Sequence, residues 1–190
     1  MKKTYLLLVV AASFGVALSS CNKIKSKIAL PTTISWSYEM TMTVPPEGDT
    51  TVAHSVSNGG FSYNLDSMIK KNTSNLLSLS NIDTFEVTGC TLTINNPDAN
   101  NNFQNFQMAS LSFSTNYNGT KTSMGEIDDN PNTYASTLTV PVNSSVNLKN
   151  YIAPAGTTSI NYEMMGKLRK ATTDSLSVTV HVDYNIHVTP

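Results

Sequence analysis

The chain has 190 residues, of which 13% are charged and 39% are hydrophobic, and its formal net charge is −1. This length supports one domain with a substantial core, and regular apolar alternation excludes an intrinsically disordered protein. The basic residues are too few and too scattered for a broad nucleic-acid-binding patch, and two cysteines are too few for a disulfide framework.

The N-terminal residues have the pattern of a secretion signal. Lys2 and Lys3 precede an uncharged apolar run from Tyr5 to Leu18, and two serines then lead to Cys21. The run of about 14 residues is shorter than the roughly 20 that a membrane-spanning helix needs. The pattern therefore favours a cleaved signal over a transmembrane anchor.

The segment Leu18-Ser19-Ser20-Cys21 resembles the lipobox of bacterial lipoproteins. In that family the cysteine thiol receives a diacylglycerol, and a peptidase cuts immediately before it. The resemblance implies that residues 1–20 are lost and that Cys21 carries a membrane anchor, whereas a plain secretory signal is the alternative. Asn22 is not the aspartate that this family associates with inner-membrane retention, so a lipid-anchored cell-envelope location, in the outer membrane of a Gram-negative cell, is favoured. The leaflet stays open.

Residues 21–31 are interpreted as the lipidated N-terminus and a tether, ahead of one domain over residues 32–190. Lys23, Lys25 and Lys27 lie in this tether, while from Ile28 onward seven basic residues face thirteen acidic ones, a difference of −6. A basic tether is attracted to anionic headgroups by about 1 kcal/mol per residue near the surface. A solvated linker is the alternative interpretation of the three lysines.

Two long segments alternate apolar and polar residues with the period of a half-buried strand, namely residues 34–44 and 176–188. We predict that residues 157–169 and 175–188 form a long antiparallel hairpin. Shorter elements are expected between these segments: strands at 51–57, 84–94 with a bulge at Gly89, 107–117 turned by Asn118-Gly119, and 134–142; a short helix at 65–72 capped by Asn64 or Asp66; and a helical turn at 147–152.

These elements predict an all-β domain: a single antiparallel β-sandwich of about seven or eight strands with one or two short helical segments. A closed barrel is the alternative.

Candidate metal ligands are weak. His181 and Asp183 share the polar face of the last strand, about 6.5–7 Å apart, whereas His187 lies too far along it to join them. Two oxygen-rich loops contain Asp98 and the pair Asp128 and Asp129, and they are able to share a calcium ion only if both lie at one end of the sandwich. A solvated polar face and ordinary turn chemistry are the simpler interpretations, so no metal and no cofactor are predicted.

Three other features have competing interpretations. Phe103 and Phe106 follow the first loop and are expected to pin it to the core, although exposed rings are able to stack on sugars. Cys90 is expected to be a buried, inert thiol. Methionines on strand faces indicate either an ordinary core or an interior that adapts to an apolar ligand, and they are Met40, Met42, Met164 and Met165.

Asp49-Thr50-Thr51, Asp66-Ser67-Met68 and Asp174-Ser175-Leu176 resemble the O-glycosylation motif of exported Bacteroidota proteins, and the composition is similar to lipoproteins of that group. The resemblance implies glycans at Thr50, Ser67 and Ser175.

No catalytic motif occurs in the chain, so an enzyme is not predicted. We expect a non-catalytic binding or scaffolding module that is held at a membrane by its N-terminal lipid and contacts an envelope protein or a glycan. A carrier of a lipid or other apolar ligand in the domain interior is the alternative.

Overall fold

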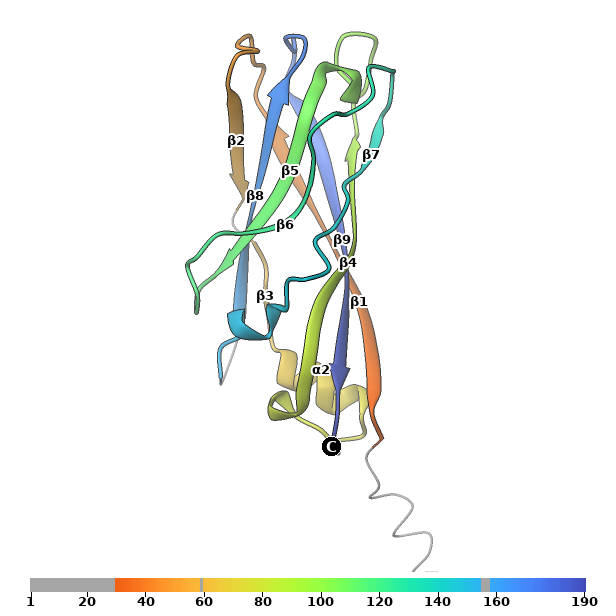
Figure 1. The fold of residues 1–190 in the computed structure, drawn as a ribbon, viewed down its shortest axis with the longest axis vertical. Coiled ribbons are helices and arrows are strands. Elements are labelled where there is room, and N and C mark those ends of the chain that lie inside the picture. Colours follow the sequence, from red (N-terminus) through yellow and green to blue (C-terminus); the bar gives the residue numbers. More distant parts are fainter. Residues whose placement is uncertain (1–29, 59, 155–157) are drawn as a thin grey trace, which may run out of the picture.

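Two antiparallel sheets face each other along the length of the molecule in a computed structural model that describes residues 30–58, 60–154 and 158–190 (Figure 1). This arrangement confirms the all-β prediction and the sandwich, because the strands form two separate sheets rather than a closed barrel. Residues 1–29, which include the lipobox and most of the tether, lie outside the described residues.

The first sheet contains, in spatial order, β1 (Thr32–Val44), β9 (Leu176–Val188), β4 (Ile82–Ile94) and β7 (Thr137–Thr139). The second contains β2 (Ala53–Asn58), β8 (Thr158–Leu168), β5 (Phe106–Thr115) and β6 (Thr122–Ile127), and β3 (Ser62–Tyr63) also pairs with β8. The helical segments are α2 (Leu65–Asn72), η1 (Leu79–Asn81), η2 (Phe103–Asn105) and η3 (Leu148–Tyr151).

The predicted hairpin of the last two strands is wrong. β8 pairs with β2 and β5, whereas β9 lies between β1 and β4 in the other sheet, so residues 169–175 cross from one layer to the other. Alternation shows that each strand is half-buried, but both sheets have a buried inner face. The pattern therefore does not distinguish a hairpin from a crossover.

The interior is closed by the inward side chains of both sheets. Every inward residue of β9, from Leu176 to Val188, is at most 1% exposed, which identifies β9 as the central strand of the first sheet. Met40 and Met42 are also buried, and they pack in the core. The methionine face of β1 thus closes on other side chains.

Several local predictions are confirmed. The helix at 65–72 forms, and Asn64 caps it by accepting a hydrogen bond from the backbone N–H of Ser67 at 2.9 Å. The β4–β9 register shifts between Val87 and Gly89, as the glycine predicted. The β5–β6 hairpin also forms, although residues 116–121 make a longer connection than a two-residue turn.

The strand predicted at 134–142 is shorter than expected. Only Thr137–Thr139 pair with β4, and Val142 then makes an isolated bridge with Gly125 in the other sheet. Pro141 lies between the two pairings and has no N–H to donate, so the chain leaves β4 there. This segment consequently connects the two sheets at one edge of the sandwich.

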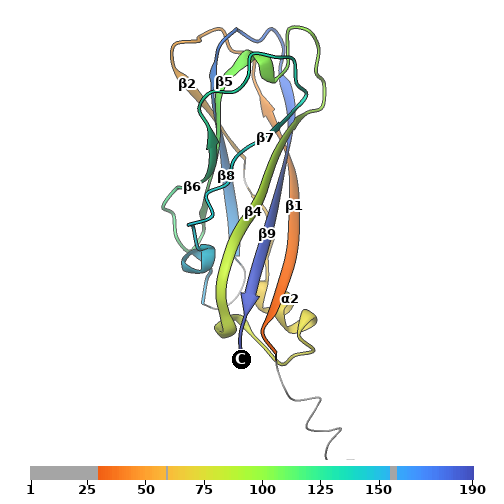
Figure 2. The same cartoon turned by 45° about the vertical axis from the view of Figure 1, so that its right-hand side comes forward.

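The two ends of the molecule differ in character (Figures 1 and 2). The start of β1, α2, η1 and the C-terminus lie at one end, which we call the proximal end. The loops 45–52, 95–102, 128–136 and 169–175 lie at the opposite, distal end. Because β1 and β9 each contain 13 residues, they separate the ends by roughly 40 Å.

Candidate functional site at the loop-bearing end

Buried polar side chains are concentrated beneath the distal loops. Five such residues are at most 6% exposed, although Asn and Thr normally lie at the surface, and they are Asn101, Asn102, Asn105, Asn130 and Thr172. Buried polar groups are tolerated when they are hydrogen-bonded, and each of the five has partners. The distal loops therefore form a fixed surface.

Asn101 connects the 95–102 loop to the 169–175 loop. Its Nδ2 atom donates to Asp98 Oδ2 at 3.0 Å and to Asp174 Oδ2 at 3.1 Å. Its Oδ1 atom accepts from the backbone N–H of Thr173 at 3.1 Å and of Asp174 at 3.3 Å. One buried amide thus links two loops that are more than 70 positions apart in the sequence.

Asn130 and Arg169 connect the 128–136 loop to η2. The Nδ2 atom of Asn130 donates to the carbonyl oxygens of Phe103 at 2.7 Å and Phe106 at 3.0 Å. The guanidinium of Arg169 donates to the carbonyl oxygen of Asn130 at 2.7 Å and to that of Gln104 at 3.1 Å. Three segments therefore converge on one set of backbone carbonyls.

The 45–52 loop is held in a similar way. Thr172 donates its backbone N–H to the carbonyl of Glu47 at 3.0 Å, and its hydroxyl accepts from the backbone N–H of Glu47 at 2.9 Å. The Glu47 carboxylate in turn lies 3.0 Å from Nδ1 of His54 on β2.

The outer surface of this end mixes exposed apolar and acidic side chains. Val52 and Tyr134 are exposed on two of the loops, and Asp129 is exposed near Arg169. At the end of β6, the hydrogen bond that the protonated Glu126 carboxyl donates to the neighbouring Asp128, together with the negative charge of Asp128, raises the pKa of Glu126. Such a surface suits recognition by shape and hydrogen bonding.

The two loops considered for calcium do lie at the same end, but the oxygens of Asp98 already have partners. The Asp98 carboxylate accepts hydrogen bonds from the side chain of Asn101 and from the backbone of Asn100 and Asn101, and these lower its pKa. Within the part of the chain that the structure describes, no group of three or more His, Cys, Asp or Glu is arranged to hold a metal ion. The turn interpretation accounts for the Asp98 loop.

His181 and Asp183 were considered as two ligands of one metal ion, but their side chains contact each other directly. Nε2 of His181 lies 3.0 Å from Asp183 Oδ1, and Nδ1 lies 2.9 Å from Glu39 Oε1 on β1. Both ring nitrogens are therefore engaged by carboxylates. His187 is engaged separately, with Nδ1 2.8 Å from the hydroxyl of Thr33.

The remaining sequence candidates fall in several places. Cys90 is buried, as predicted, and burial raises the pKa of its thiol to about 12. Phe103 and Phe106 are buried in the core, so the alternative that their rings stack on sugars is wrong. Cys21 lies outside the described residues.

The residues with an O-glycosylation resemblance lie at both ends. Thr50 is half-buried in the 45–52 loop, and Ser175 is exposed at the start of β9. Ser67 is exposed in the first turn of α2, at the proximal end.

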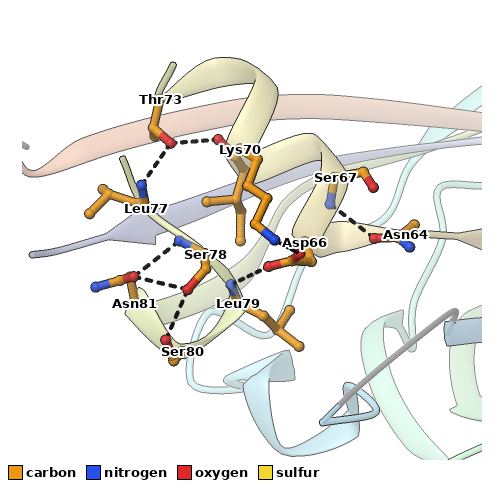
Figure 3. A network of polar contacts seen from close by, with 11 residues as sticks. Asn64, Asp66, Ser67, Lys70, Thr73, Leu77, Ser78, Leu79, Ser80 and Asn81 are labelled. Atoms are coloured by element: carbon orange, nitrogen blue, oxygen red, sulfur yellow. Dashed lines mark hydrogen bonds and ion pairs between the residues drawn. The ribbon is translucent and has the colours of Figure 1, made fainter. Parts of the chain in front are cut away.

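The proximal end is stabilised by local contacts between α2 and η1 (Figure 3). Asp66 accepts a hydrogen bond from the backbone N–H of Leu79 at 2.9 Å and pairs with Lys70 at 2.6 Å, and these contacts lower the pKa of Asp66. The Thr73 hydroxyl donates a hydrogen bond to the backbone carbonyl of Ile69 and accepts one from the backbone N–H of Leu77. These contacts lie within about 15 positions of each other, in contrast to the long-range links of the distal end.

Sequence reasoning missed the residues that organise the distal end. Asn101 was part of an Asn-rich run interpreted as turns, and Arg169 and His54 lay in segments interpreted only as strands. Their partners come from distant loops, so no local spacing points to them. The one feature of the sequence that points to this network is the number of Asn residues in 95–105, which exceeds what a single turn needs.

Comparisons with known proteins add little to this geometry. The sequence matches no family model and no curated protein. Among solved structures, Desmodium yellow mottle tymovirus is similar with a TM-score of 0.26 and 14% identity over 83% of this chain and 88% of that chain. Infectious bursal disease virus strain Gx is similar with a TM-score of 0.35 and 10% identity, and the match covers 83% of this chain but only 32% of that chain. Likenesses this distant carry no functional argument.

Proposed function

We propose that the chain is a lipid-anchored cell-envelope module that presents its distal loops to a partner and has no catalytic activity. The observation that supports this proposal most is that the described chain begins at the proximal end, whereas the rigid loops lie at the distal end. The nine peptide units that separate Cys21 from Leu30 span at most about 30 Å. A lipid on Cys21 would therefore keep the proximal end near the membrane and the loops directed away from it.

The surface chemistry of the proximal end is consistent with a nearby membrane. Leu30 and Leu76 are 66% and 39% exposed there, and Lys71 is exposed in the last turn of α2. Exposed apolar and basic side chains are tolerated where a lipid surface with anionic headgroups is close. Among the described residues, none of the helices has the length and apolar character to cross a membrane.

The distal end supports recognition of an envelope protein or a glycan. Its loops are held by buried amides, so binding costs little conformational entropy, and exposed side chains such as Tyr134 offer contact area. We favour this function over carriage of a lipid, because Met40 and Met42 are buried in a closed core. The cleft beside Met164 has a volume of about 150 Å³, which is too small for a lipid, since sites for drug-sized ligands measure roughly 300–1,000 Å³.

Metabolic labelling tests the anchor. A palmitate analogue fed to cells that express the full-length chain should enter the wild type and not the Cys21→Ser variant, and only the wild type should partition into the membrane fraction. An unlabelled wild-type chain that retains residues 1–20 would refute the anchor.

Cross-linking probes in place of two exposed tyrosines test which surface of the domain binds the partner. Tyr134 on the distal 128–136 loop and Tyr117 in the β5–β6 connection are 57% and 54% exposed, so they form a matched pair. A photoreactive phenylalanine analogue in place of Tyr134 should cross-link a discrete partner in intact cells, and the same probe in place of Tyr117 should not. Equal cross-linking from both positions would contradict a distal binding surface.

A further inference from the structure

A small cleft opens where the edges of the two sheets meet near the distal end. Its walls come from the end of β1, from β2, from β8 and from the start of β5, and its volume is about 150 Å³. The apolar side chains that line it are those of Val44, Pro45, Val56, Phe106, Met164 and Leu168. An apolar cavity of this size admits a single benzene-sized ring.

The sequence of β8 explains why the cleft exists. The residues of β8 that face the core are Thr158, Ile160, Tyr162, Met164, Gly166 and Leu168, and the glycine contributes no side chain. The ring of Phe106 occupies part of that space, because a Cβ on Gly166 would lie 3.0 Å from Phe106 Cδ1. The rest of the space stays open between Met164 and Leu168.

The mouth of the cleft is polar and fixed. The Asp49 carbonyl lies 3.0 Å from Nε2 of His54, and because a carbonyl only accepts, this nitrogen donates. The Glu47 carboxylate lies 3.0 Å from Nδ1 of His54 and accepts a backbone N–H from Asp49 at 2.9 Å. Both ring nitrogens are thus occupied, whereas a carboxylate has about four acceptor positions.

The mouth therefore has unused acceptor capacity at Glu47 and no free donor on His54. A ligand that places an apolar ring on Val56 and Met164 would be able to donate a hydrogen bond to Glu47. Because Glu47 already pairs with His54, an uncharged donor suits the mouth better than a second cation.

We propose that this cleft is a binding site for a small uncharged aromatic compound that carries one hydroxyl group. The ring fills the part of the cleft that Phe106 leaves open, and the hydroxyl donates to Glu47. The site is separate from the outer surface of the distal loops and does not depend on the lipid anchor.

Phenol is the probe for a titration of the full-length chain followed by NMR. We expect saturable shifts of the Met164 and Val44 methyl signals, a nuclear Overhauser effect between phenol and the Met164 methyl, and a Kd of roughly 0.1–10 mM, as few contacts are available to so small a ligand. Toluene, which has the same shape without the hydroxyl, should bind at least threefold more weakly. Absence of the Overhauser effect in the wild type would overturn the proposal, and equal affinity for toluene would overturn the role of Glu47.

A pair of valine substitutions locates the site. Val56→Phe fills the cleft and should weaken phenol binding at least tenfold, whereas Val52→Phe, at an exposed valine outside the lining, should change it less than twofold. Equal effects of the two substitutions would place the phenol elsewhere and refute the site. The wild-type Overhauser experiment decides the question even if Val56→Phe does not fold.

Discussion

Nε2 of His181 lies 3.0 Å from Oδ1 of Asp183, two positions further along β9. Glu39 on β1 engages the other ring nitrogen, so the imidazole lies between two carboxylates on the outer face of the first sheet. The hydrogen bond to Glu39, followed by that to Asp183, raises the pKa of His181 above its ordinary value. This geometry makes the histidine a local source of pH dependence.

We predict that His181 contributes stability at low pH and loses that contribution as the pH rises. Because the pKa is raised in the folded state, the contribution is complete below the ordinary pKa of about 6.5 and disappears as the pH passes the folded value. The difference in unfolding free energy between the wild type and His181→Gln should shrink between pH 6 and pH 9. Its size should not exceed about 1 kcal/mol, since these side chains are largely exposed.

His187→Gln is the control for this measurement, because His187 hydrogen-bonds the hydroxyl of Thr33 and, among the residues that the structure describes, no carboxylate. Chemical denaturation at several pH values provides the free energies. A difference for His181→Gln that grows with pH would contradict the assignment.

Gly89→Ala should lower the pKa of His181 indirectly, by displacing the Asp183 carboxylate. A Cβ on Gly89 would lie 2.8 Å from Oδ2 of Asp183, so the carboxylate must shift, and the shift disturbs its hydrogen bond with His181. Gly48→Ala is the control, because nothing lies within 4 Å of a Cβ there. An NMR titration of the His181 ring in the two variants should show a lower midpoint only for Gly89→Ala.

This bulge also illustrates what the sequence predicts well. Gly89 interrupts an alternating strand, and Asn64 precedes a short helical pattern, so both features follow from neighbouring residues. The crossover from β8 to β9 depends instead on which of two buried faces each strand meets. Alternation is the same in both cases, which is why the hairpin prediction failed.

The candidate site was even less accessible from the sequence. Asp98 and its turn follow from local chemistry, whereas Asn101 reaches Thr173 and Asp174 through the packing of two loops. Hydrogen bonds of that range are set only when the sandwich has formed. The cleft beside Gly166 is likewise a property of four strands together.

Asn101→Ala should destabilise the fold by about 2–3 kcal/mol. The substitution removes a buried amide and leaves the backbone N–H groups of Thr173 and Asp174, whose hydrogen bonds are partly buried, without their acceptor. Asn132→Ala, at an exposed position of the neighbouring loop, should change the unfolding free energy by less than about 0.5 kcal/mol. Similar midpoints of urea denaturation for the two variants would show that Asn101 does not organise the loops.

The stability of the Asn101→Asp variant should also depend on pH. It places a third carboxylate beside Asp98 and Asp174, and it replaces a donor with an acceptor. Mutual repulsion is relieved when the carboxyls are protonated, so this variant should approach the stability of the wild type as the pH falls from 7 to 4. Thermal denaturation across that range measures the effect.

Tyr162 and Tyr184 share a buried hydrogen bond of 2.5 Å between their hydroxyl oxygens, across the two sheets. Either single change to Phe leaves one hydroxyl without its partner, and each should cost about 1–2 kcal/mol of unfolding free energy. The double change removes both hydroxyls, so it should cost less than the sum of the single changes. An additive double-mutant cycle would show that the hydroxyls do not interact.

Because Cys90 is buried, counting the reactive thiols before and after unfolding tests whether Cys21 is modified. Burial, and secondarily the charge of Asp183, raises the pKa of the Cys90 thiol to about 12, so a thiol reagent at pH 8 should not modify it in the native protein. The proposed lipid occupies the other cysteine of the chain. Protein extracted from cell envelopes should therefore show no reactive thiol when folded and one after denaturation in guanidinium. Two thiols after denaturation would mean that Cys21 is free, and rapid modification of the folded Cys21→Ser variant would mean that Cys90 is accessible.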